Sequence, residues 1–262
     1  MKRLELDGRI ALVTGAARGI GRATAMELAR GGAVLALAGR NEASLGDTAA
    51  AVPALGGTVG SLHAADLASA EAATGLADAV LARHGRLDIL INNAGALALG
   101  TPEELDPAGF ANMLAVNVVA PYALMRAVLP AMKARGAGTI VNISSIRFRL
   151  PDKGFGPYCA TKAGLLAITQ CLHRELAGTG VRVLALSPGL TATGMADAIH
   201  AYSGPQGDTA PADIPPPERS ARVIAWLATD EAADLAGADA ILQFDAVTLR
   251  AGLETGLAER AA

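Results

Sequence analysis

The 262-residue chain has only two cysteines, and they are poorly placed for a disulfide. Cys159 and Cys171 lie twelve positions apart in one predicted helix, which separates them by about 18 Å at a rise of about 1.5 Å per residue. The Cα atoms of a disulfide lie within about 7 Å of each other. We therefore expect no bond between them, which agrees with a soluble, cytoplasmic protein.

The sequence also lacks a long hydrophobic run, a secretion signal and an excess of positive charge. No apolar run reaches the ~18 residues of a membrane span, and the N-terminus has no long apolar segment ending in a small-residue cleavage site. The formal net charge of −3 provides no basic face for nucleic acid. Only 18% of the residues are charged, so a sizeable core is expected rather than disorder.

Short apolar segments alternate with longer helical patterns along most of the chain. The predicted strands are nearly all apolar, which is typical of a parallel sheet with helices on both faces. The strands are predicted over 9–15, 33–40, 58–66, 87–95, 138–145 and 181–189, and the helices over 19–32, 42–53, 69–84, 106–133 and 157–178. The long helix 106–133 is apolar over much of its circumference, which favours burial against another subunit as well as the sheet.

The segment HAYSGPQGDTAPADIPPP, 200–217, breaks the alternation. It is rich in Pro, Gly and Asp, and a loop of this length is usually functional or disordered. It follows the sixth strand, so it would lie at the carboxyl ends of the strands, where ligands bind in open α/β sheets. We interpret 195–217 as a substrate lid. The alternative is an interdomain linker, but the residues that follow are too few for an ordinary domain, and we predict a single domain over 1–262.

The first predicted strand leads into a helix through TGAARGIG, 14–21. Gly15, Gly19 and Gly21 would let the backbone approach a pyrophosphate, and the N–H groups that open the helix would point at its negative charge. In this position, after a strand and before a helix, the glycine pattern predicts a dinucleotide site.

The second strand ends in LAGRN, where many NAD-binding domains carry an acid that bonds the ribose 2′-hydroxyl. Here Gly39 stands in that place, Arg40 follows it, and Arg18 lies in the glycine turn. Two guanidinium groups suit a 2′-phosphate, so the sequence favours NADP(H) over NAD(H). The alternative is two arginines on the surface without a ligand.

Tyr158 and Lys162 lie four positions apart in YCATK, so a helix would place both side chains on one face. A free tyrosine has a pKa near ~10, and a nearby cation favours the phenolate and lowers it. Such a pair is suited to proton transfer near neutral pH. Taken alone, the pair could equally be two neighbours on a helix surface.

These motifs occur in a fixed order. TGAARGIG is followed by NNAG (92–95), an asparagine in the long helix, NISS (142–145) and YCATK (158–162). Over roughly residues 5–240 the chain thereby resembles the short-chain dehydrogenases/reductases. The resemblance implies a Rossmann-like, doubly wound parallel sheet of about seven strands in the order 3-2-1-4-5-6-7. It also implies a homotetramer or homodimer, with helices 106–133 and 157–178 at the interface.

The resemblance implies roles for four catalytic positions. Tyr158 and Lys162 match the family's proton-transferring pair, and Ser145 lies the usual thirteen residues before the tyrosine, with Ser144 as the alternative. Asn117, in LAVNVVAP, matches the active-site asparagine, which would hold a water in a proton relay; its alternative is a buried polar residue of the helix. The implied reaction is hydride transfer between nicotinamide and a carbonyl or secondary alcohol, with tyrosine as general acid or base.

The resemblance also implies the cofactor contacts. Asp66 resembles the family's adenine-contacting acid, the segment from Asn92 lines the cofactor, and SPGLTAT holds the nicotinamide amide, with Thr193 favoured over Thr191. No metal site is predicted. The predicted cofactor-binding residues are Gly15, Arg18, Gly19, Ile20, Gly21, Arg40, Asp66, Leu67, Asn93, Ala94, Gly95, Tyr158, Lys162, Pro188, Gly189, Thr191 and Thr193.

Two segments depart from the family pattern. Relatives commonly end the seventh strand with an Asp-Gly-Gly turn, whereas 238–253 retains Asp245 without the glycines, which puts the C-terminal oligomer contact in doubt. Arg147 stands where relatives often have a small residue. It could meet an anionic substrate, although a solvated arginine is the simpler interpretation.

Two other functions fit the same fold. A catalytically silent cofactor-binding regulator or scaffold would typically lose the tyrosine or the lysine, and both are present. An epimerase or dehydratase would normally have a larger C-terminal substrate region. The sequence leaves the small-molecule substrate open among 3-oxoacyl thioesters, sugars, steroids and small ketones, because lids vary freely.

Overall fold

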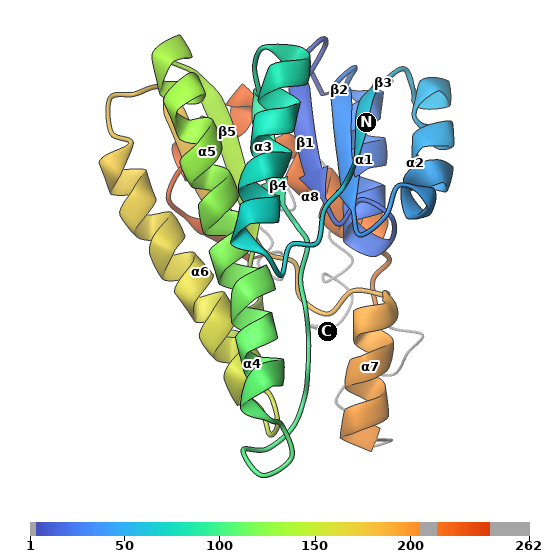
Figure 1. Ribbon diagram of the computed structural model, residues 1–262, viewed down its shortest axis with the longest axis vertical. Coiled ribbons are helices and arrows are strands. Elements are labelled where there is room, and N and C mark those ends of the chain that lie inside the picture. The colour runs from blue at the N-terminus through green and yellow to red at the C-terminus, as the bar shows by residue number, and fades with distance from the viewer. Residues whose placement is uncertain (1–3, 205–213, 242–262) are drawn as a thin grey trace, which may run out of the picture.

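Seven parallel strands form one sheet in the order β3-β2-β1-β4-β5-β6-β7, which confirms the predicted topology (Figure 1). The computed structural model describes residues 4–204 and 214–241. The chain starts in the middle of the sheet, winds outward to β3, and then returns to β4 beside β1 and winds out the other way. The strands are β1 (Ile10–Thr14), β2 (Val34–Gly39), β3 (Thr58–Ala64), β4 (Ile89–Asn92), β5 (Gly138–Ile143), β6 (Val181–Ser187) and β7 (Asp239–Ile241).

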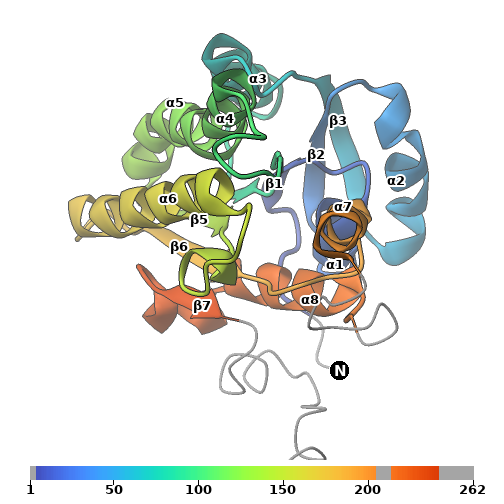
Figure 2. The ribbon, with the colours of Figure 1, turned by 90° about the horizontal axis from the view of Figure 1, so that it is seen from below.

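Helices cover both faces of the sheet, and the apolar strands bury side chains against both sets (Figure 2). In β1, Ala11 and Val13 face one helical layer while Ile10 and Leu12 face the other, as the two-residue repeat of a strand requires. One layer contains α1 (Gly19–Arg30), α2 (Gly46–Ala51) and α8 (Pro217–Leu227), and the other contains α3 (Ala70–His84), α5 (Ala120–Arg135) and α6 (Gly156–Glu175).

The long helix predicted over 106–133 is interrupted. It consists of α4 (Pro107–Leu114), a π-helical stretch η3 (Ala115–Val119) and α5. Asp106 caps its start by accepting a hydrogen bond from the N–H of Gly109. By length and composition alone, Pro107–Arg135 could cross a membrane; 44% of its most apolar window is buried in the fold.

The segment predicted as an irregular loop over 200–217 is partly helical. Helix α7 (Gly194–Ser203) includes its first four residues, and α8 begins at Pro217. Residues 205–213 of the predicted lid, and Asp245 of the predicted C-terminal turn, lie outside the described residues. The predicted helix 42–53 is a series of short pieces: η1 (Ala43–Leu45), α2 and η2 (Pro53–Leu55). Two further 3-10 segments are η4 (Ile146–Phe148) and η7 (Asp230–Leu235).

Candidate active site

The candidate residues gather at the carboxyl ends of the strands. Figure 1 shows α4 and α7 extending beyond the sheet at this edge. The sheet's winding reverses between β1 and β4, and ligands of open α/β sheets bind at such a reversal. The glycine turn after β1, the segment after β4 and the serines after β5 therefore border one region.

The glycine turn has the conformation that its sequence predicts. Gly15 has φ +66° and Gly19 has φ +55°, in the left-handed region that side chains disfavour. Gly21 lies in α1, and a Cβ there would overlap the carbonyl oxygen of Gly15 and lie 2.5 Å from Nδ2 of Asn93. The turn thus packs so closely that only hydrogen fits, and it leaves backbone N–H groups at the start of α1 exposed for an anion.

Thr14, the last residue of β1, joins this turn to the end of β4. Its hydroxyl accepts the N–H groups of Asn93 and Ala94, both at 3.0 Å, and donates to the carbonyl of Ile91 at 3.2 Å. The Asn93 amide donates to the Thr14 carbonyl at 2.9 Å. Asn93 therefore supports the glycine turn. Thr14 was missed from the sequence, because its partners are nearly eighty residues away.

Arg18 and Arg40 are both exposed at this end of the site. Arg18 precedes α1 in an extended conformation, and Arg40 follows Gly39, the last residue of β2. Within residues 4–204 and 214–241, neither guanidinium forms an ion pair, so both remain available to an anion. Asp66 is exposed after β3, where its carboxylate accepts the N–H of Ala68 at 3.1 Å. Leu67 is buried, so only its backbone can face a cofactor.

Ser145 and Ser144 occupy different environments just after β5. Ser144 is buried, and its hydroxyl donates to the Lys162 carbonyl at 3.5 Å. Ser145 is half-buried; its hydroxyl caps η4 by accepting the N–H of Arg147 at 3.2 Å, and it lies near enough to Tyr158 to oppose the rise in the pKa of that tyrosine. The structure thus brings Ser145, and not Ser144, to the tyrosine.

Tyr158 and Lys162 are both buried on one face of α6. The Lys162 Nζ lies 5.8 Å from the centre of the Tyr158 ring and donates to the Ile143 carbonyl at 2.8 Å. The Tyr158 and Phe155 rings pack in a T-shaped arrangement, with ring centres 6.5 Å apart. Phenol, ammonium and serine hydroxyl therefore meet in one place.

The pKa of Tyr158 differs from the sequence expectation. Burial raises it from 10.0 to about 12, and hydrogen bonding to Ser145 opposes this only in part. Burial also lowers the pKa of Lys162 from 10.5 to about 8. The sequence predicts that the lysine lowers the tyrosine pKa, but burial disfavours the charged form of each side chain, and desolvation is the largest cause of both shifts.

Asn117 is fully buried in the π-helical stretch η3, where it joins three segments. Its amide nitrogen donates to the Ala96 carbonyl at 2.9 Å and to Thr161 Oγ1 at 3.0 Å, and its oxygen accepts the Ala96 N–H at 2.8 Å. A Cβ on Gly95 would lie 3.5 Å from Asn117 Oδ1 and 3.8 Å from Lys162 Nζ. Asn117 and Lys162 therefore both border Gly95, and the amide hydrogens of Asn117 are used to hold the fold.

The loop after β6 runs back toward the glycine turn. Gly189 has φ +74°, and the buried Thr191 hydroxyl lies 3.4 Å from the Gly189 carbonyl and 3.3 Å from Ser220 Oγ. Thr193 is half-buried, and its Cγ2 would lie 3.1 Å from a Cβ on Gly19. This contact supports Thr193 over Thr191 as the residue that faces a cofactor.

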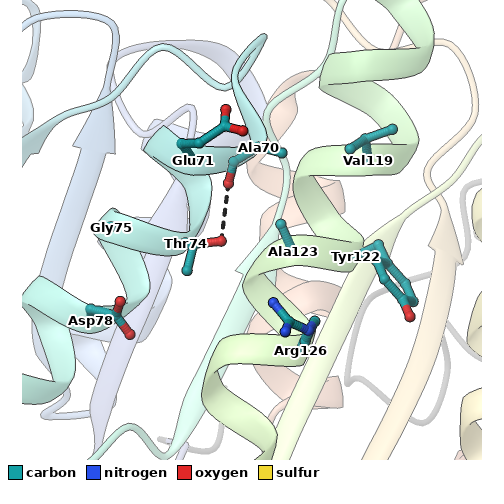
Figure 3. Close-up of a pocket in the computed structure, with 9 residues that line it drawn as sticks. All are labelled: Ala70, Glu71, Thr74, Gly75, Asp78, Val119, Tyr122, Ala123 and Arg126. Carbon is teal, nitrogen blue, oxygen red and sulfur yellow. Dashed lines mark hydrogen bonds between the residues drawn. The ribbon is translucent and has the colours of Figure 1, made fainter.

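A hollow lies away from these residues, between α3 and α5 (Figure 3). It has a volume of about 670 Å³, and none of the candidate catalytic or cofactor residues lines it. Its walls carry Glu71 and Asp78 from α3, with Tyr122 and Arg126 from α5. This hollow is a surface groove, separate from the candidate active site.

The short chain dehydrogenase family matches residues 9–203. The chain belongs to this family. It is an oxidoreductase that acts on CH–OH or C=O groups of small molecules with a nicotinamide cofactor, as the family's dehydrogenases and reductases do.

Individual relatives cover nearly the whole chain. A D-threitol dehydrogenase of Mycolicibacterium smegmatis is 37% identical over 244 residues, covering 90% of this chain and 92% of the relative. A metagenomic short-chain oxidoreductase in complex with NADP has a TM-score of 0.73 at 36% identity, covering 86% of this chain and 93% of that one. An NAD⁺-bound xylitol dehydrogenase has a TM-score of 0.83 at 28% identity, covering 90% and 98%. The two structures hold different cofactors, so the fold alone leaves the choice between them open.

Proposed function

We propose that this enzyme transfers hydride between NADP(H) and a carbonyl or secondary alcohol, with Tyr158 as general acid and base. The observation that supports this proposal is the meeting of the Ser145 and Tyr158 hydroxyls beside buried Lys162, at the edge of the sheet where the glycine turn lies. A catalytically silent regulator has no need of a buried lysine beside a buried phenol, because burying either group without function costs stability.

When bound, the nicotinamide would supply or accept the hydride. The Ser145 and Tyr158 hydroxyls would donate hydrogen bonds to the substrate oxygen, where negative charge develops. The Tyr158 phenol is protonated at neutral pH, so it has a proton to give to a carbonyl oxygen. Ser145 and Tyr158 would thus hold the substrate and neutralise its oxygen.

The proton that Tyr158 gives up must be replaced. Lys162, whose pKa burial lowers to about 8, can exchange a proton near neutral pH. Its Nζ and the Asn117 oxygen both border Gly95, and the second lone pair of the Asn117 oxygen could hold a water there. The proposed path therefore runs from Tyr158 through Lys162 and Asn117 to solvent.

The proposed preference for NADP(H) rests on Arg18 and Arg40. Both guanidinium groups are exposed and free of ion pairs within the part of the chain that the structure describes, and β2 ends in Gly39 without a carboxylate. A 2′-phosphate would pair with both, whereas the hydroxyl of NAD would leave them without a partner. The close-packed glycine turn and the contact of Thr193 with Gly19 fit a dinucleotide lying across this edge.

We propose a second copy of the chain as a partner, in a homodimer or homotetramer. Leu114, Val119 and Tyr122 are large apolar side chains that remain 37%, 45% and 54% exposed along α4, η3 and α5. Near them, Arg126 of α5 and the acids of α3 line the groove of Figure 3, so a two-fold-related copy could pair its arginine with those acids. The neighbouring face of α6 exposes small residues, which permits close approach; they are Ala160, Ala163 and Ala167.

We propose one domain over 1–262, a lid over 195–217 that includes all of α7 except its first residue, and a cytoplasmic location, where the cysteines Cys159 and Cys171 would stay free. Fractionation of cells that express the chain would test the location.

Absorbance at 340 nm tests the proposed activity. We expect oxidation of NADPH with one or more members of a panel of ketones, ketoses and 3-oxoacyl thioesters, and reduction of NADP⁺ with four- and five-carbon polyols. The polyols are included because the similar proteins include dehydrogenases of threitol and xylitol. Binding of NADPH without turnover on any panel member would support the silent regulator instead.

A further inference from the structure

Helix α7 contacts the candidate site at both of its ends. At its start, the Met195 sulfur lies 3.9 Å from the Tyr158 hydroxyl, which donates to it. At its end, Tyr202 crosses to two loops on the other side of the site. The Met195 thioether thus accepts the hydrogen bond of the Tyr158 hydroxyl, to which a substrate oxygen must bind.

The Tyr202 ring rests on a glycine. Gly154 has φ +78°, and a Cβ added to it would lie 2.6 Å from Cε1 and Cζ of Tyr202. Any side chain at this position would push the ring away. The next residue, Phe155, is fully buried, and its ring packs in a T-shaped arrangement with that of Tyr158. The glycine that Tyr202 contacts is therefore bonded directly to a residue that contacts the catalytic tyrosine.

The Tyr202 hydroxyl donates to Oε2 of Glu104 at 3.3 Å. The same carboxylate oxygen accepts the Thr101 N–H at 2.8 Å, and this backbone hydrogen bond is the main reason that the Glu104 pKa is lowered. The Gly100 N–H donates to the Gly154 carbonyl at 3.1 Å. The loop after β4 and the loop before α6 are therefore tied together, and Tyr202 binds to both.

We infer that Tyr202 is a positioning residue: by binding Gly154 and Glu104 it holds α7 closed, and α7 in turn holds Met195 over the Tyr158 hydroxyl. Substrate must displace the thioether to reach that hydroxyl, and opening of α7 would carry the thioether away. The inference rests on the proposed function only where it takes Tyr158 to be the residue that binds the substrate oxygen.

Hydrogen–deuterium exchange tests the closure without any substrate. In Tyr202→Phe the ring stays and the hydrogen bond to Glu104 is lost, so the amides of 194–203 should exchange about three- to tenfold faster. Tyr122→Phe is the matched control, because Tyr122 is an exposed tyrosine on α5, and α7 should exchange as in the unaltered protein. Equal exchange of α7 in Tyr202→Phe and the unaltered protein would overturn the inference.

A pair of glycine variants tests the ring contact. Gly178 has φ +75° and open space around it, so Gly178→Ala reproduces the backbone strain of Gly154→Ala without the clash. We expect faster exchange of α7 in Gly154→Ala only. In a Tyr202→Ala background, Gly154→Ala should add nothing further. If Gly178→Ala opens α7 equally, or if the two changes at Tyr202 and Gly154 simply add, the ring contact does not hold the helix.

Steady-state kinetics connects the closure to the reaction. Because the closed helix competes with substrate for the Tyr158 hydroxyl, Tyr202→Phe should lower KM for the carbonyl substrate about three- to tenfold, with kcat and the Kd of NADPH retained. A loss of kcat at unchanged KM would contradict the positioning role. If the unaltered enzyme turns over nothing, the proposed function fails, and the exchange measurements still decide whether Tyr202 closes α7.

Discussion

The glycine turn after β1 and helix α7 border the same site, but different contacts hold them in place. The turn is held by backbone: Gly21 packs on the Gly15 carbonyl, and the Asn93 amide bonds the Thr14 carbonyl. Helix α7 is held by side chains that reach across the site, Tyr202 at one end and Met195 at the other.

Because of this difference, the cofactor end of the site, at the glycine turn, and the substrate end, at α7, should tolerate substitutions differently. A backbone contact at van der Waals distance admits no added atom, so the cofactor end should respond to single methyl groups. A side-chain contact on a half-exposed helix can be broken and remade, so the substrate end should respond with altered affinity and motion while the fold persists. Tyr158 and Lys162 lie between the two ends. They are held neither by close backbone packing nor by an exposed side-chain contact, because the core buries them.

The largest effect is expected at the junction of the two ends. Tyr158→Phe removes the proton donor and should lower kcat by about 10²–10⁴-fold while NADPH binding is retained. Turnover at 340 nm and NADPH fluorescence titration measure the two properties separately. Normal activity in this variant would show that the two ends do not meet at Tyr158.

The second-largest effect is expected at the cofactor end, from a substitution in the glycine turn. In Gly21→Ala the methyl group would overlap the Gly15 carbonyl, which costs about 1–3 kcal/mol and lowers Tm by several degrees. NADPH affinity should fall as well, because the turn must move. Gly46→Ala is the control, since Gly46 has open space around it. Thermal denaturation that leaves Gly21→Ala as stable as the control would refute backbone packing as the cause.

Arg40→Asp tests the same end by charge alone. A carboxylate there would repel a 2′-phosphate and could accept a ribose hydroxyl, so the ratio of NADPH to NADH affinity should fall about ten- to a hundredfold. Arg174→Asp, an exposed position near the end of α6, should leave the ratio unchanged. Calorimetric titration with both cofactors measures it, and an unchanged ratio in Arg40→Asp would speak for NAD(H).

The smallest effect concerns the buried pair. The folded pKa of Lys162, about 8, lies below its unfolded value of 10.5, so the unfolded chain binds more protons between these values. The stability that the neutral lysine contributes is present above pH 10.5 and is lost as pH falls through 8. Relative to Lys162→Met, the protein should therefore gain a few degrees in Tm between pH 7.5 and 10.5. A constant difference across this range would mean that Lys162 is not desolvated.

Particular elements show how far the sequence could be interpreted. The apolar strands and the positions of α1, α3 and α6 agree with prediction within a few residues, because alternation and glycine placement are local signals. The resemblance to a family supplied the strand order, which the sheet confirms. The π-helical stretch at Asn117 and the helical start of the lid were not predicted, because neither follows from residues within a few positions.

The sequence by itself determined the backbone of this site: which glycines turn, which strands are buried, and that Tyr158 and Lys162 share one face of a helix. Only the tertiary structure decided how strongly those groups are desolvated and which hydrogen-bond partners they have. Burial from every side sets the direction of both pKa shifts, the partners of Asn117 come from segments 21 and 44 residues away, and Tyr202 meets Glu104 across 98 residues. Local sequence controls torsion angles within a turn, whereas desolvation and long-range hydrogen bonds exist only when distant segments meet.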